Sequence, residues 1–71
     1  MRNTKDAIVI ALKAVDSDPQ QPAYLDTLAT AYYEAGQNEK AVDAEMKALA
    51  LNPSSVPYKK ALEKYHSSTT H

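Results

Sequence analysis

Apolar residues in the first quarter of the chain recur at the spacing of an amphipathic α-helix. The pattern begins after Asn3, which resembles a helix-capping residue, and it must end before Pro19, because proline disfavours helical dihedral angles in the residue ahead of it. It predicts a helix over residues 4–18. One apolar stripe follows the i, i+3, i+4, i+7 rule and consists of Ile8, Ala11, Leu12 and Val15. A second apolar side, roughly opposite, is formed by Ala7, Ile10 and Ala14.

Residues 22–55 carry the clearest pattern, two amphipathic helices joined by a short turn. Pro22 suits the first position of a helix, where its missing N–H costs nothing. Gly36 lies where a left-handed C-terminal cap is needed, and Asn38 is placed to cap the following helix. So short a connection predicts an antiparallel hairpin. The apolar stripe of the first helix is Leu25, Leu28, Ala29 and Tyr32; the second helix has one stripe of Val42, Met46 and Leu49 and another of Ala41, Ala44 and Ala48.

A fourth helix is predicted over residues 56–66. Ser55 precedes it as a capping residue, and Pro57 lies in its first turn. Its apolar side consists of Tyr58, Ala61, Leu62 and Tyr65. Residues 67–71 are polar and without pattern, so we expect a frayed tail. Nothing alternates in the manner of a strand, and the chain is therefore predicted to be one all-α domain over residues 1–71.

Composition narrows the classes of protein to which the chain can belong. Its 71 residues leave no room for a catalytic domain beside the helices, and the absence of cysteine excludes disulfides. Eight basic and nine acidic residues are intermixed, which argues against binding to nucleic acid or to an acidic membrane. The longest apolar run is far shorter than the ~20 residues that span a bilayer. We expect a soluble protein whose compartment stays open, with the cytoplasm favoured.

The chain matches itself at a fixed separation of 34 residues. Pro19 corresponds to Pro53, and Leu28 corresponds to Leu62. Further pairs at this separation are Ala7 with Ala41, Ile8 with Val42, Leu12 with Met46, Ala14 with Ala48, Val15 with Leu49 and Tyr24 with Tyr58. A helix–turn–helix unit of this period is typical of a helical solenoid.

At this point the chain resembles the tetratricopeptide repeat (TPR) family. The residues that fit the family pattern are Leu25, Leu28, Ala29, Tyr32, Ala41, Ala48 and Pro53. The resemblance covers about residues 4–66 and implies a TPR-type α-solenoid fragment of about four antiparallel helices: the second helix of a preceding repeat at 4–18, a complete repeat at 22–55, and the first helix of a following repeat, or a capping helix, at 56–66.

At two positions the residue differs from the one most typical of the family, although Leu25 keeps the large residue that the pattern requires. Leu25 stands where tryptophan is typical, and Glu45 stands where an aromatic residue is expected; Ala11 holds the equivalent place in the first helix. Because Leu12 and Met46 follow directly, we expect the large packing residue to have moved by one position. On this interpretation Glu45 is at least partly exposed.

Few residues are candidates for catalysis or for binding a metal or cofactor. His66 and His71 are the only imidazoles, without the cysteine or paired carboxylates that would complete a metal site. The hydroxyls of Thr27, Thr30 and Ser54 lack a partnered base, and no glycine-rich loop is present. We therefore predict neither an enzyme nor a cofactor or metal site. Four of the five tyrosines are expected to pack between helices, whereas for Tyr33 packing and partner contact stay equally open.

The resemblance also implies a binding surface, because in this family the first helix of each hairpin lines a concave groove for an extended peptide or a helix. Carried over by motif, the lining residues are Ala23, Asp26, Thr27, Thr30, Tyr33, Glu34, Lys60 and Lys64. An ordinary solvated helix face is the alternative. Asp26 and Thr30 replace the Lys and Asn with which some members grip a terminal carboxylate, so a carboxylate clamp is not expected.

Three hypotheses about function follow. The first is a non-catalytic scaffold that recognises a peptide or helix of a partner protein. The second is a self-association module, a homodimer formed through the uncovered strip of Ala7, Ile10 and Ala14. The third is an accessory domain that serves an enzyme on a neighbouring segment or chain, which these residues do not distinguish from the first.

Overall fold

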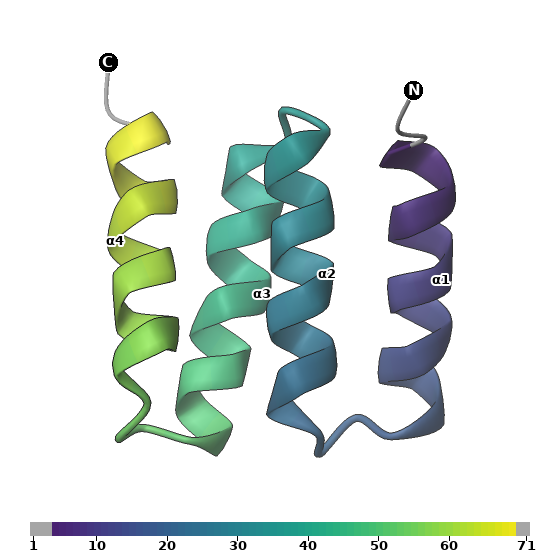
Figure 1. Cartoon of the computed structure of the whole chain (residues 1–71), viewed down its shortest axis with the longest axis horizontal. Helices are drawn as coiled ribbons and strands as arrows, with labels where there is room; N and C mark the ends of the chain where they lie inside the picture. The colour runs from purple at the N-terminus through teal and green to yellow at the C-terminus, as the bar shows by residue number, and fades with distance from the viewer. Residues whose placement is uncertain (1–3, 70–71) are drawn as a thin grey trace.

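The computed structural model describes residues 4–69, which form four α-helices that pack against one another in chain order (Figure 1). They are α1 (Thr4–Ser17), α2 (Pro22–Glu34), α3 (Asn38–Leu51) and α4 (Val56–Thr69). Consecutive helices run in opposite directions, and the described residues contain no strand. The prediction of an all-α chain is confirmed. Asn3, as well as residues 70–71, lie outside the described residues.

Local signals set several of the helix ends as expected. Pro22 is the first residue of α2, and Ser55 caps α4 by accepting a hydrogen bond from the Tyr58 amide at 3.3 Å. Gly36 has φ +80° and follows α2 in a Schellman arrangement, in which the Gln37 amide donates to the Tyr32 carbonyl at 2.9 Å. A left-handed glycine therefore turns the chain into α3.

Two other predicted ends are wrong. Asn38 does not cap α3 but is its first residue, and the preceding Gln37 makes no side-chain cap. The side-chain Nδ2 of Asn38 instead donates to the Ser68 carbonyl at 3.4 Å. Residues 67–69, predicted to fray, continue α4. The single hydroxyl proton of Ser68 is shared between the Lys64 carbonyl at 3.2 Å and the Tyr33 hydroxyl at 3.3 Å, so a contact with α2 stabilises this last turn.

The core of the molecule consists mainly of small side chains. Most of the buried apolar side chains belong to alanines, and fully enclosed ones on α2 and α3 allow these two helices to approach closely. Leu25 and Leu28 of α2 and Tyr65 of α4 supply the larger buried side chains. The buried alanines are Ala11, Ala29, Ala31, Ala41, Ala44 and Ala48. The predicted buried stripe of α2 is confirmed at Leu25, Leu28 and Ala29, while Tyr32 is half-buried.

The expected exchange of packing residues did not occur. Glu45 has an exposed fraction of 0% and Ala11 of 2%, whereas Met46 is 53% and Leu12 44% exposed. Each helical residue turns by about 100°, so the neighbour of an inward residue points well away from the core. The prediction that Glu45 is partly exposed is therefore wrong: the acid itself occupies the inward position.

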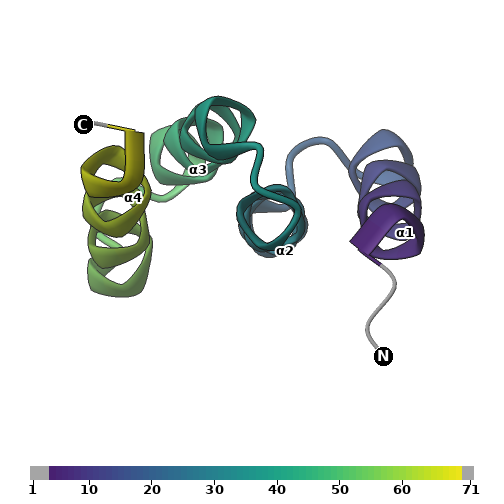
Figure 2. The same ribbon diagram turned by 90° about the horizontal axis from the view of Figure 1, so that it is seen from above.

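The helices do not lie in a single plane. Viewed from above, α2 and α4 flank α3 and are both displaced toward the same side of the molecule (Figure 2). We call the surface on that side the α2–α4 face. On the opposite side α1 and α3 each pack along α2 and make little contact with each other. The molecule therefore has two distinct faces on which a partner could bind.

Candidate functional site

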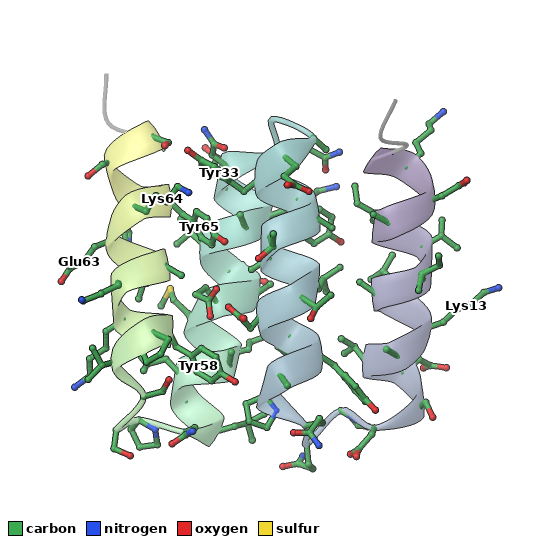
Figure 3. The ribbon with its side chains drawn as sticks, viewed as in Figure 1. Lys13, Tyr33, Tyr58, Glu63, Lys64 and Tyr65 are labelled. Carbon is green, nitrogen blue, oxygen red and sulfur yellow. The ribbon has the colours of Figure 1, made fainter. Side chains whose placement is uncertain are left out.

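Side chains from α2 and α4 meet on the α2–α4 face. The rings of Tyr33 and Tyr65 stack with centroids 4.7 Å apart, and the Tyr65 hydroxyl lies 3.3 Å from the Thr30 hydroxyl (Figure 3). Lys64 lies over the Tyr33 ring, with its Nζ 5.0 Å from the centroid. Tyr33 is half-buried by these contacts. Packing against α4 is thus one role of Tyr33, and part of its side chain stays accessible.

The predicted groove residues divide into two groups. Asp26, Thr30, Tyr33 and Lys64 surround the contact between α2 and α4. The others lie exposed on the same two helices, and they are Ala23, Thr27, Glu34 and Lys60. Thr27 and Thr30 donate their hydroxyl protons to the carbonyls of Ala23 and Asp26, four residues earlier in each case. Their oxygens can still accept a hydrogen bond from a partner.

Glu45 is the residue of this region whose position differs most from the sequence-based expectation. It is the largest fully buried side chain, and neither carboxyl oxygen has a hydrogen-bond donor among the described residues. Burial raises the pKa of Glu45 from 4.5 to about 8, and the neighbouring Asp26 contributes in two ways: a protonated Glu45 donates to the Asp26 carboxylate, and the two negative charges would repel. At neutral pH Glu45 is therefore mainly the neutral acid.

Tyr65 joins this acidic pair to α4. Burial raises the pKa of the Tyr65 hydroxyl; its hydrogen bond with Thr30 acts in the opposite direction, while the charges of Glu45 and Asp26 raise the pKa further. Residues of three helices thus form one polar cluster beneath the α2–α4 face: Asp26 and Thr30 from α2, Glu45 from α3 and Tyr65 from α4. The 34-residue period makes Glu45 equivalent to Ala11, which lies on the apolar stripe of the first helix. This equivalence was the sequence signal that Glu45 points inward.

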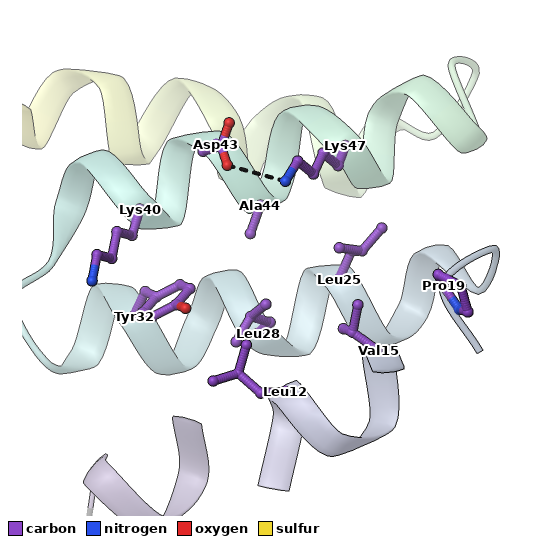
Figure 4. A pocket seen from close by; sticks show the side chains of 10 residues that line it. All are labelled: Leu12, Val15, Pro19, Leu25, Leu28, Tyr32, Lys40, Asp43, Ala44 and Lys47. Atoms are coloured by element: carbon purple, nitrogen blue, oxygen red, sulfur yellow. Dashed lines mark ion pairs between the residues drawn. The ribbon is translucent and has the colours of Figure 1, made fainter. Parts of the chain in front are cut away.

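A cavity of about 500 Å³ lies on the other side, between α1 and α3 with α2 as its floor (Figure 4). Aliphatic and aromatic side chains form most of its wall, and an exposed ion pair between Asp43 and Lys47, 3.3 Å apart, lies on its α3 side. The lining residues are Leu12, Val15, Pro19, Leu25, Leu28, Tyr32, Lys40, Asp43, Ala44 and Lys47. The apolar pattern of the sequence does not predict this cavity, because it places Leu12 in the core.

The proposed self-association strip on α1 is only partly open. Ile10 is 67% exposed, whereas Ala7 and Ala14 are half-buried. Val9, next to Ile10, is also exposed. The strip is therefore centred on Ile10 and Val9 rather than on the alanines.

Metal sites, membrane-spanning helices and similarity to known proteins can each indicate function. Within residues 4–69 no group of three or more potential ligands is placed to hold a metal ion, and none of the described helices has the length and apolar character needed to cross a membrane. Comparison of the chain with protein-family models, curated proteins and solved structures found no match.

Proposed function

We propose that this chain is a TPR-type helical-repeat module that binds a peptide or helix of a partner protein on the α2–α4 face. The helix boundaries agree with the 34-residue sequence period, because helices start at Thr4 and Asn38 and again at Pro22 and Val56. Glu45 departs from the family pattern, in which an aromatic residue is expected at this position. The chain keeps the buried position but fills it with the acid.

One observation carries the proposal: α2 and α4 present polar side chains toward the same side of the molecule, and contacts between them hold that surface in place. The Thr30–Tyr65 and Tyr33–Ser68 hydrogen bonds join the two helices. Rigid placement of polar groups lowers the entropic cost of binding. Exposed Thr27, Lys60 and Lys64 offer hydrogen-bonding groups and positive charge to an extended or helical segment.

Selection from a displayed random-peptide library tests this proposal. We expect enriched peptides whose binding weakens at least tenfold in Thr27→Arg and Lys60→Glu, two exposed positions that do not enter the core. Lys13→Glu on α1 is the matched control, since Lys13 is exposed and points away from the other helices (Figure 3). Peptides that bind both α2–α4 variants normally but lose affinity for Leu12→Glu would move the site to the cavity between α1 and α3, and the proposed face would be wrong.

Self-association through α1 is a second candidate function, favoured by the 67% exposure of Ile10 beside an exposed Val9. Large apolar side chains that lie exposed near one another are typical of contact sites between proteins. Light scattering should give a dimer mass for the wild type and a monomer mass for Ile10→Glu. A monomer for both at high concentration excludes this candidate.

A further inference from the structure

The molecule encloses an acid that the proposed binding function does not use. Glu45 is 0% exposed, and its carboxyl oxygens meet no donor among the described residues. An ionised carboxylate in such a place would be costly, because burial without a hydrogen-bond donor or a counter-charge removes its hydration without replacement. The side chain therefore fits its site only as the neutral acid.

The groups that face Glu45 come from both helices packed on α3. Asp26 contributes a second carboxyl from α2, and Tyr65 contributes its hydroxyl from α4; these are the titratable neighbours with which Glu45 interacts. No cation is among these neighbours. Lys64, a positive charge on this face, lies over the Tyr33 ring. A single proton shared by the two carboxyls is the simplest way to satisfy this arrangement: a protonated Glu45 donates and Asp26 accepts.

We propose that the Asp26–Glu45 pair is a proton-dependent latch, which holds α4 against α2 and α3 while the pair keeps one proton and loosens α4 when both carboxyls are ionised. Ionisation leaves two adjacent negative charges with no donor between them, and only water can then stabilise Glu45. Tyr65 is 4% exposed and lies near both acids, so displacement of α4 admits water to them. Release of α4 in turn separates the two halves of the α2–α4 face.

α4 is the helix suited to such a motion. It packs mainly against α3, and its links to α2 are side-chain contacts of Tyr65, Lys64 and Ser68 rather than close backbone packing. A helix that packs mainly on one neighbour opens at lower free energy than a helix packed between two. The predicted direction follows from the raised pKa of Glu45, about 8: α4 is held most firmly in acidic solution, its docking weakens as the pH rises toward about 8, and it changes little above that pH.

The latch concerns the packing of the chain itself, so its test needs no partner and does not depend on the proposed function. Carboxyl-carbon NMR gives the titration midpoint of Glu45, and amide hydrogen exchange between pH 6 and pH 9, expressed as protection factors, reports the docking of α4. In the wild type we expect Glu45 to titrate near pH 8 and the protection of α4 to fall more than tenfold between pH 6 and pH 8 and then to level off, with less change in α2.

Three variants complete the test. Glu45→Gln keeps the shape without the charge and should retain α4 protection to pH 9. Asp26→Asn removes the neighbouring charge and should move the Glu45 midpoint to lower pH. His66→Gln removes the imidazole of α4 and should keep the wild-type pH dependence. The latch is overturned if wild-type Glu45 titrates near 4.5, or if α4 loses the same protection in Glu45→Gln as in the wild type.

Discussion

Replacing Glu45 with Gln should raise the stability of the folded chain at neutral and alkaline pH. The wild type holds a proton on Glu45 that the unfolded chain has already released between its ordinary pKa of 4.5 and the folded value of about 8. Each pH unit in this window lowers the free energy of unfolding by about 1.4 kcal/mol. The contribution of Glu45 to stability is therefore complete below pH 4.5, is lost as the pH rises to about 8, and is constant above it.

The magnitude is large for so small a domain. The window from 4.5 to about 8 corresponds to a loss on the order of 4–5 kcal/mol. Domains of this length are typically stable by only about 5 kcal/mol. Gln cannot ionise, and its amide group can donate to the Asp26 carboxylate. The variant should therefore keep near pH 8 most of the stability that the wild type has near pH 5.

Urea unfolding followed by circular dichroism at pH 5, 6, 7, 8 and 9 measures this difference. The stability gap in favour of Glu45→Gln should be small at pH 5 and reach several kcal/mol at pH 8 to 9. Asp43→Asn is the control, because Asp43 is an exposed carboxyl on the same helix, and its gap to the wild type should stay within about 0.5 kcal/mol. A gap for Glu45→Gln that does not change with pH would refute the reasoning that Glu45 is buried and neutral.

Three further substitutions test the packing and the turns. Leu28→Ala deletes a buried side chain of the core cluster and should cost about 2–4 kcal/mol in urea unfolding, whereas a loss below 1 kcal/mol would contradict its burial. Gly36→Ala places a Cβ at φ +80° with no atom within 4 Å, so only backbone strain opposes it, and the melting temperature should fall by the equivalent of about 1 kcal/mol; an unchanged melting temperature would exclude the left-handed turn. Lys47→Ala breaks an exposed pair with Asp43 and should change stability by less than about 0.5 kcal/mol.

Helix ends determined by adjacent residues could be predicted from the sequence. Pro22, Gly36 and Ser55 act through their own backbone or side chain within one turn, and each has the expected role. The end of α4 depends instead on Ser68 and Asn38, which are 30 residues apart in sequence. Such contacts leave no local pattern, so residues 67–69 could not be assigned to the helix in advance.

The candidate surfaces were less predictable, for a different reason. Hydrophobic patterning assigns positions by residue type, and a glutamate is assigned to the surface even when its helical phase points inward. The equivalence of Glu45 with Ala11 indicated the correct orientation. The large apolar residues that follow, Met46 and Leu12, favoured the opposite prediction, that they point inward instead. The cavity between α1 and α3 depends on how far apart two helices lie on α2, and no spacing of residues reports that distance.

The claim that a partner binds the α2–α4 face is tested most directly by NMR mapping. Titrating the labelled chain with the tightest library-selected peptide should shift the amide signals of Thr27, Thr30, Lys60 and Lys64, on two helices at once. Shifts confined to the residues that line the cavity between α1 and α3, or to the exposed side of α1 around Ile10, would contradict the account.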